Sequence, residues 1–334
     1  MALQSTIPPT RPFPIPVAYF GMVLGIVGMG TAWRMAAKLW HLPGFVGEAL
    51  MAVAAGIWVC LSVVYIVKWV WRRPAALAEV RDPIQCCFIS LFPGTTMLMG
   101  AAVAPYSHDS ALGLVIAGTV GQLAFAAYRS AGLWRGLHSP EATTPGVYLP
   151  TVSGNLISAI ALGALGYADW GILFLGAGLF SWLSLEGVIL QRLRTLGALP
   201  PPIRPAIGIQ LAPPLVACEA YLFTNGGTPD IFAQLLFGYG LLQLIFLARL
   251  LRWTFEQPFS VSFWAFSFGI SALAVSALHF YAHNPAGVVG HMAVPIFIFA
   301  NGAIGLLLLG TALRIAQGKF LMPPPAPARS PATE

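Results

Sequence analysis

The sequence predicts an all-α integral membrane protein whose ten transmembrane helices form five helical hairpins, with the odd helices in an inner ring around a central pore. Three observations predict this class. The 334 residues are 57% hydrophobic and only 8% charged, whereas soluble domains carry about 25% charged residues. Long apolar runs recur along the chain, and about 20 such residues cross a bilayer. Every second run contains a short core with proline or glycine.

The apolar runs give the count of ten helices. They cover residues 15–39, 45–70, 84–104, 110–134, 147–167, 170–191, 205–224, 230–251, 260–282 and 290–316. We expect one ten-helix transmembrane domain at 15–317, an N-terminal cytoplasmic segment at 1–14 and a C-terminal cytoplasmic tail at 318–334. We expect no cleavable signal peptide, because no charged segment and small-residue cleavage site frame the first run.

The basic residues predict the orientation. The two ends of the chain and the connections after even runs hold 15 of the 17 Lys and Arg residues, and only Arg34 and Lys38 fall on the other side. Cytoplasmic loops carry the excess of Lys and Arg, so both termini are expected in the cytoplasm, which an even number of helices satisfies. The net charge of +6 is explained in this way, and we expect no nucleic-acid partner.

The odd runs share a core in which an apolar residue precedes Pro or Gly. The five pairs are Phe20–Gly21, Phe92–Pro93, Leu149–Pro150, Ala212–Pro213 and Phe268–Gly269. Proline kinks a helix and frees a backbone carbonyl, which is costly in lipid. The odd runs are therefore expected inside, around a passage, with the even runs facing lipid. The alternative is that these small residues and prolines serve only tight helix packing.

Polar side chains lie on the same odd runs. The candidates for lining the passage are Thr95, Ser153, Asn155, Gln210, Ser267 and Ser271. Ser267 and Ser271 would share one helix face, because a spacing of four returns to nearly the same side. Phe268 would flank that face, next to Gly269, which leaves room for the ring to swing. Such a ring is either a hydrophobic gate or an ordinary packing residue.

Charged residues are almost absent from the middle of the odd runs. The exception is Glu219, either a coupling acid for proton-linked transport or a residue that reaches the outer membrane interface. Glu186, on an even run, is expected to make a structural contact near Arg192. A neutral passage with basic loops suits anions weakly, because basic residues raise the local anion concentration. No metal-ligand spacing or cofactor motif is present, so we expect no metal, no cofactor and no catalytic residue.

Several stretches resemble the TehA family of bacterial tellurite-resistance and dicarboxylate transporters, which is related to the plant guard-cell slow anion channels. The most specific are "EATTPGVYLPTV", "FLGAGLFSWLSLE", "ILQRLR", "GIQLAP", "LFGYGLLQL" and "FWAFSFGISALA". The resemblance covers nearly the whole chain. There are two departures. Gly187 stands where the family has the proline of "LEPV", and Pro213–Pro214 stands where one proline is usual.

The resemblance implies a passive anion channel with ten helices in five hairpins, forming a homotrimer with one pore in each subunit. The implied gate is Phe268, with Gly21 close to its ring. Pro93, Pro150 and Pro213 carry over as kinks that shape the pore. The implied partners are the lipid bilayer and small anions, namely chloride, malate or tellurite. The implied location is the bacterial inner membrane.

Other functions remain as alternatives to the gated anion channel. A secondary, proton-coupled transporter of C4-dicarboxylates would use Glu219, but such transporters usually carry midplane charges and paired inverted repeats, whereas this chain shows five parallel repeats. A membrane enzyme acting on tellurite lacks a nucleophile set, a metal site and a redox motif. A multidrug exporter fits poorly, because a neutral passage does not favour cationic drugs.

Overall fold

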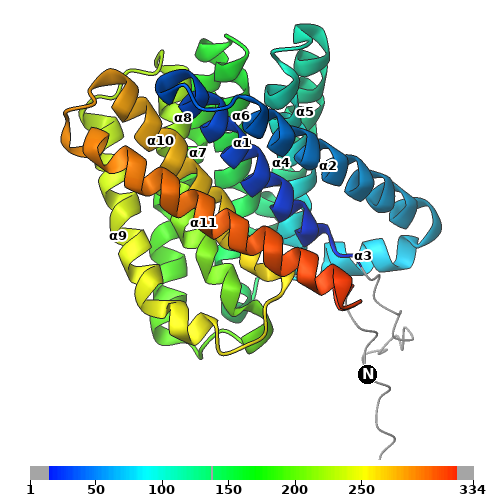
Figure 1. Cartoon of the computed structure of the whole chain (residues 1–334). Helices are drawn as coiled ribbons and strands as arrows, with labels where there is room; N and C mark the ends of the chain where they lie inside the picture. The colour runs from blue at the N-terminus through cyan, green and yellow to red at the C-terminus, as the bar shows by residue number, and fades with distance from the viewer. Residues whose placement is uncertain (1–14, 137, 322–334) are drawn as a thin grey trace, which may run out of the picture.

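The computed structural model describes residues 15–136 and 138–321. These residues form helices without a strand, and they contain ten spans long and apolar enough to cross a membrane (Figure 1), as predicted. Spans one to ten are Val17–Trp40, Phe45–Trp71, Gln85–Val103, His108–Leu133, Pro145–Ala164, Ala168–Thr195, Pro201–Thr224, Ile231–Thr254, Val261–His283 and Val288–Ala316. The predicted cytoplasmic segment 1–14, and the predicted tail beyond residue 321, lie outside the described residues.

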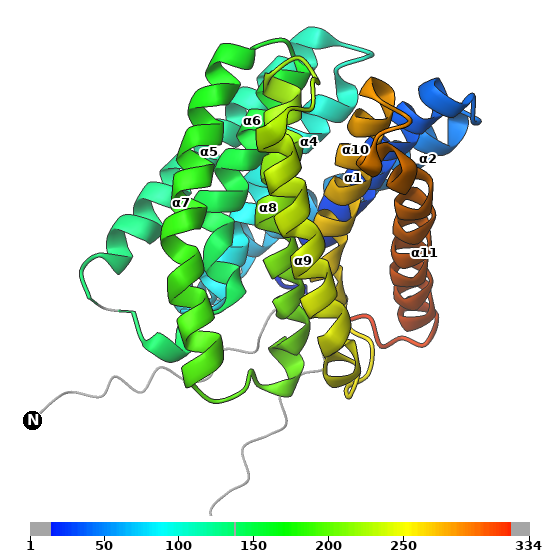
Figure 2. The same ribbon diagram turned by 90° about the vertical axis from the view of Figure 1, so that its left-hand side faces the viewer.

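Odd and even spans differ sharply in burial. In the most apolar stretch of each odd span 67% to 83% of the residues are buried, against 22% to 33% in the even spans. The even spans turn large apolar side chains such as Leu173 and Ile298 outward, where lipid would cover them. The odd spans therefore form an inner ring and the even spans an outer one, as predicted. Figure 2 shows the two helices of single hairpins side by side, α8 (Ala212–Thr224) with α9 (Ile231–Thr254) and α10 (Ser267–His283) with α11 (Val288–Ala316).

Each odd span has a 3₁₀ or π segment directly before its α-helix, and span five begins with a further 3₁₀ turn at Pro145–Val147. The segments directly before the α-helices lie at Val17–Phe20, Gln85–Ser90, Leu149–Ser153, Pro201–Leu211 and Val261–Phe266. The α-helices that follow are α1 (Gly21–Trp40), α4 (Leu91–Val103), α6 (Gly154–Ala164), α8 and α10. We call the five points of change junctions. They lie at or within a few residues of the proline or glycine in each predicted core.

The prolines fit this construction. Pro93 and Pro213 lie in the first turns of α4 and α8, where the missing N–H is not needed by the helix. Pro150 lies in the π segment Leu149–Ser153, which is only one turn long, as π helices usually are. The even spans, by contrast, are the continuous α-helices α2 (Phe45–Trp71), α5 (His108–Leu133), α7 (Ala168–Thr195), α9 and α11.

Two ion pairs fix the ends of span one. At the end of the molecule that carries the basic connections, Lys68 Nζ lies 2.7 Å from Glu79 Oε2 on the short helix α3 (Arg73–Arg81), and Glu79 Oε1 accepts the Val17 N–H at 3.1 Å. At the opposite end, Arg34 binds Glu48 on α2 with two hydrogen bonds of 2.7 and 2.8 Å. Both pairs tie span one to span two, its partner in the first hairpin.

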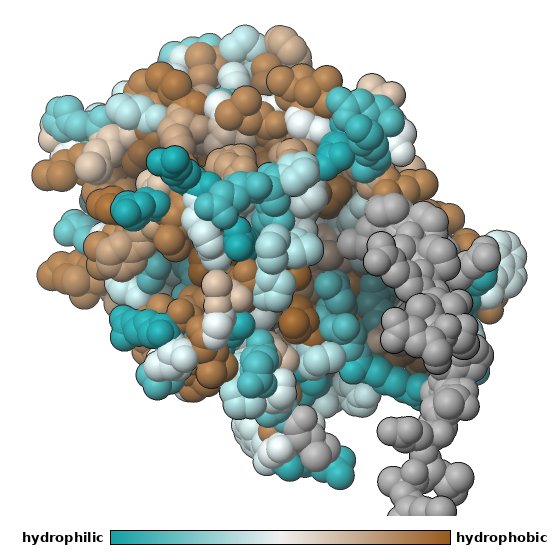
Figure 3. Space-filling model, turned by 90° about the horizontal axis from the view of Figure 1, so that it is seen from below, coloured by the Kyte–Doolittle hydropathy of each residue, from teal (hydrophilic) through white to brown (hydrophobic). Residues whose placement is uncertain are grey.

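The end of the molecule near α3 presents many polar residues. Seen from that side in Figure 3, hydrophilic residues are spread over much of the face, with hydrophobic residues around parts of its rim. The connections after even spans lie at this end because successive spans alternate in direction, and together with the span ends beside them they hold most of the arginines.

Candidate functional site

The five junctions meet at one cavity of about 590 Å³. The residues that line it at or within a few residues of the five junctions are Gly21, Leu91, Leu149, Ala212 and Phe268. They come from all five odd spans, which are separated by 56 to 70 residues in the sequence. The predicted inner ring thus encloses a real space, and the repeated core of the sequence lies at its wall.

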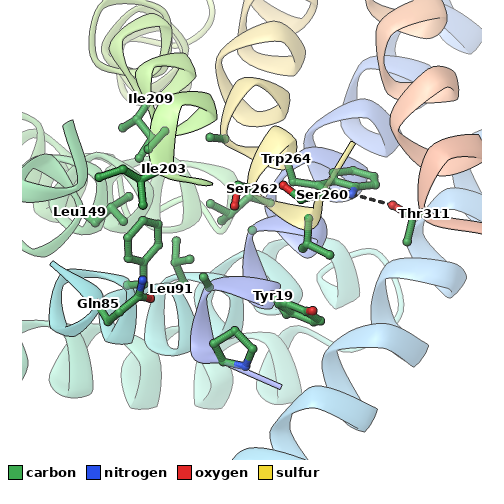
Figure 4. A pocket seen from close by; sticks show the side chains of 18 of the residues that line it. Tyr19, Gln85, Leu91, Leu149, Ile203, Ile209, Ser260, Ser262, Trp264 and Thr311 are labelled. Atoms are coloured by element: carbon green, nitrogen blue, oxygen red, sulfur yellow. Dashed lines mark hydrogen bonds between the residues drawn. The ribbon is translucent and has the colours of Figure 1, made fainter. Parts of the chain in front are cut away.

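The wall of the cavity is mostly apolar, with a few hydroxyl and amide groups. Figure 4 shows Leu91, Leu149 and Ile209 among the lining side chains, together with Ser260 and Ser262. The Trp264 indole N–H, also at the wall, donates to Thr311 Oγ1 at 2.9 Å. A largely apolar wall with scattered donors offers no strong fixed binding site, so an ion inside it would be held weakly.

The charged side chains that line the cavity are both basic. They are Arg314 and Lys319, near the end of span ten, and the described lining contains no acidic residue. Arg314 is oriented by the Phe259 carbonyl, which accepts from its Nε at 2.8 Å and its Nη2 at 2.5 Å. Arg314 takes part in none of the salt bridges among the described residues. Its positive charge therefore attracts anions to this part of the cavity.

The Phe268 ring is buried beside α1. A Cβ on Gly21 would meet no atom within 4 Å, so Gly21 opens on the cavity. Gly28, two turns further along α1, lies beside the ring, with a Cβ position 3.8 Å from Phe268 Cδ2. The expected closeness of Gly21 to the ring stays a prediction, and α1 approaches the ring at Gly28.

Gly269 lies at a close contact between two spans. A Cβ there would lie 2.8 Å from Leu211 Cγ, at the end of the 3₁₀ segment of span seven. The missing side chain lets spans seven and nine approach closely. The expected room for the ring of Phe268 to swing stays a prediction.

Ser267 and Ser271 face a neighbouring helix. Cβ atoms on Gly25 and Gly28 would lie 2.3 and 2.1 Å from their hydroxyl oxygens, so both serines fit into glycine gaps on α1. Their hydroxyls donate to carbonyls of their own span, Ser267 to Trp264 at 2.7 Å and Ser271 to Phe268 at 3.0 Å. The prediction that they line the passage is wrong, because their common face meets α1.

Of the other polar residues predicted to line the passage, one lies at the cavity wall and the others are buried or bonded within their own spans. Ser153 lines the cavity. Thr95 donates to the Leu91 carbonyl at 2.8 Å and Asn155 to the Thr151 carbonyl at 2.6 Å, each within its own span. Gln210 is buried, and its Oε1 has no hydrogen-bond partner among the described residues.

Glu219 is buried deep in span seven. Its side chain is only 3% exposed, so the expectation that it reaches the membrane interface is wrong. It follows Ala212 by seven residues and therefore shares its helix face, which places it two turns outward from the cavity. Its Oε2 has no hydrogen-bond partner in the described part of the chain. Its role as a coupling acid stays a prediction.

Sequence reasoning missed the main partners of Glu186. Instead of a contact near Arg192, whose Nη1 donates to the Gly197 carbonyl at 3.2 Å, Glu186 accepts four hydrogen bonds from donors in spans five, six and eight. They come from Tyr148, Trp182, Tyr239 and Gln243. These donors lie up to 95 residues apart, so no local pattern could have identified the cluster.

Comparison with known proteins identifies one family and several of its members as similar to this chain. Residues 14–312 match the model of SLAC1, the voltage-dependent anion channel family. The chain is 40% identical over 314 residues to the tellurite resistance protein TehA homolog of Haemophilus influenzae, covering 94% of each chain. It is 23% identical to the S-type anion channel SLAH3 and 22% to the guard cell S-type anion channel SLAC1, both of Arabidopsis thaliana. These matches span 92% of this chain but only 49% and 57% of the plant channels.

Proposed function

Because the chain belongs to the SLAC1 family of voltage-dependent anion channels, as the match of residues 14–312 shows, we propose that it is a gated passive anion channel. The observation that carries the proposal is the meeting of five junctions, one from each odd span, at a single cavity whose charged lining is basic. The family consists of anion channels and transporters, and the proposed activity is conduction, not catalysis.

The proposed path begins at the basic end of the cavity. Arg314 and Lys319 raise the local concentration of anions there, which speeds their entry. An anion then sheds water against an apolar wall and finds scattered hydroxyl groups such as those of Ser153 and Ser260. Weak binding of this kind favours passage, because an ion that binds tightly cannot leave.

The proposed gate is Phe268. Its ring is 5% exposed and lines the cavity at the junction of span nine. A buried aromatic ring in an apolar constriction excludes water and with it any hydrated ion. Pro93, Pro150 and Pro213 would shape the pore by placing the junctions of spans three, five and seven around the same space.

The experiment compares anion currents through membranes that contain purified protein, wild type against Phe268→Ala, at equal pH on both sides. Chloride and then malate are the charge carriers. We expect a small wild-type current and a current at least about tenfold larger in the variant, because the ring no longer blocks the path. The control is Phe237→Ala, which removes an equally buried ring on α9 outside the cavity. Equal currents in Phe268→Ala and Phe237→Ala would reject the gate.

A second candidate function is a proton-coupled transporter of C4-dicarboxylates. It is favoured by one observation, the buried Glu219 with an unpartnered carboxyl oxygen, since intramembrane acids commonly act as proton relays. Malate uptake that requires a pH gradient and is lost in Glu219→Gln would establish the transporter. Passive malate current without a gradient would exclude it.

The cellular setting is proposed from the relatives. The TehA homolog carries tellurite resistance in its name, and we propose an association of this chain with tellurite resistance, with tellurite as one anion to test. We further propose a homotrimer in the bacterial inner membrane with both termini in the cytoplasm. The basic connections support the orientation through the positive-inside rule.

A further inference from the structure

We propose that the half-buried Glu186 and the buried Gln122, two side chains of the outer ring, are positioning residues that hold the cavity wall at Leu149 and thereby set which anions pass. The inference rests on the proposed function, because it concerns the width of a conducting path. It extends that function to spans four and six, whose helices α5 and α7 do not line the cavity.

The wall at Leu149 is held on both sides. Immediately before it, the Tyr148 hydroxyl donates to Glu186 Oε2 on α7 at 2.5 Å. Immediately after it, the Pro150 carbonyl accepts from Gln122 Nε2 on α5 at 2.6 Å. Leu149 thus lies between two residues that are each bound to a different outer helix, which leaves its backbone little freedom.

The local helix type explains why such support is needed. Leu149–Ser153 forms a π turn, a form that is rare in proteins and tends to occur at functional sites. The Gln122 amide reaches it because position 154 is glycine, where a Cβ would lie 1.8 Å from Gln122 Nε2. The outer helix therefore bonds directly to the backbone of the turn.

Glu186 is itself fixed. Its Oε2 accepts from Tyr148 and, at 2.8 Å, from the Trp182 indole. Its Oε1 accepts from Tyr239 at 2.8 Å and Gln243 at 3.4 Å, both on α9. Two oxygens of a carboxylate offer about four acceptor positions, so this carboxylate is fully used. Loss of a buried acceptor leaves its donors unpaired, which is more costly than the bond itself.

The test uses the Phe268→Ala channel as the parent, so that current is measurable, and adds Tyr148→Phe or Glu186→Gln. Tyr148→Phe removes only the hydroxyl that joins the Glu186 cluster to span five. The readout is the chloride-to-malate permeability ratio, obtained from reversal potentials. We expect the chloride-to-malate permeability ratio to fall by about threefold or more in each variant, because a loosened wall admits the larger anion more easily. A factor of this size corresponds to the free energy of about one hydrogen bond. The double variant should fall no further.

The matched control is Glu48→Gln in the same parent. Like Glu186→Gln, it removes a carboxylate that accepts hydrogen bonds. The donors to Glu48 are an arginine and a tyrosine, and Glu48 lies at the opposite end of the molecule and outside the cavity. We expect its permeability ratio to equal that of the parent. A ratio that is unchanged in folded Tyr148→Phe and Glu186→Gln protein, even if the currents of both ions drop together, would overturn the inference. A parent without current would instead reject the proposed channel function.

Discussion

The junctions of spans five and nine lie at the same cavity but are held in different ways. In span five, the Tyr148 hydroxyl donates to Glu186 and the Pro150 carbonyl accepts from Gln122, so two outer helices fix the residues on either side of Leu149. In span nine, Ser267 and Ser271 fit into the gaps at Gly25 and Gly28, while their hydroxyls bond only to their own span. Directional bonds fix a position, whereas small-residue packing allows one helix to shift along another at lower cost. Span nine has one such bond to its outer helix, from Trp264 to Thr311, and it lies before the junction. We therefore call the wall at Leu149, which is bonded on both sides, the fixed wall, and the wall at Phe268, which is bonded to an outer helix on one side only, the adaptable wall.

The variant with the largest expected effect tests the difference between the two walls directly. Phe268→Ala should raise the anion current at least about tenfold. Leu149→Ala, at the fixed wall, should raise the anion current by less than about threefold, because the leucine side chain is smaller than the phenylalanine ring and blocks less of the path. Planar bilayer recordings at equal protein density measure both. Equal increases would show that the two walls contribute alike to closure.

A charge at the open position of span one should have the next largest effect. Gly21→Asp fits sterically, since no atom lies within 4 Å of the new Cβ, and it places a carboxylate in the cavity. In the Phe268→Ala parent we expect anion current to fall roughly fivefold to tenfold at low salt and less at high salt, because salt screens the repulsion. Gly21→Asn is the matched neutral control. A salt-independent loss, shared by Gly21→Asn, would instead indicate blockage by size.

Packing at the adaptable wall can be tested through stability. Gly28→Ala places a Cβ about 2.1 Å from Ser271 Oγ, and such overpacking costs about 1–3 kcal/mol. Thermal unfolding in detergent should show a lower Tm, which Ser271→Gly should restore by reopening the gap. Gly302→Ala on α11, where the new Cβ meets nothing within 4 Å, should not lower the Tm, because Ala favours the helix and nothing is overpacked. A Tm that falls without rescue would mean that the two helices do not meet as described.

The smallest expected effect separates packing serines from pore serines. Ser267→Ala in the Phe268→Ala parent should change neither conductance nor the chloride-to-malate ratio, because its hydroxyl is bonded to the Trp264 carbonyl and faces α1. Ser153→Ala, which removes a hydroxyl that lines the cavity, is the comparison variant. A conductance loss in Ser267→Ala larger than in Ser153→Ala would return Ser267 to the pore.

The spans, their burial and the five junctions could be predicted from the sequence because each depends on local composition. A run of apolar residues marks a span, and a proline or glycine in the core of an odd run marks the change of helix type. The errors arose where one helix face had to be assigned to a neighbour. A spacing of four placed Ser267 and Ser271 on one face correctly, but periodicity does not tell whether that face meets a pore or α1. The Glu186 cluster was missed for the same reason, since its donors come from three separate spans.

The five junctions have a consequence for how such a passage can be adjusted. A pore built from five identical subunits repeats every wall residue five times, so a substitution acts on the whole circumference at once. Here a single chain supplies five different residues at corresponding positions, Gly21, Leu91, Leu149, Ala212 and Phe268. Each sector of the wall is encoded separately. One sector can carry a bulky ring while the opposite sectors carry small side chains. A single substitution therefore changes the width of the passage on one side only, which is a smaller change than the same substitution makes in a symmetric pore.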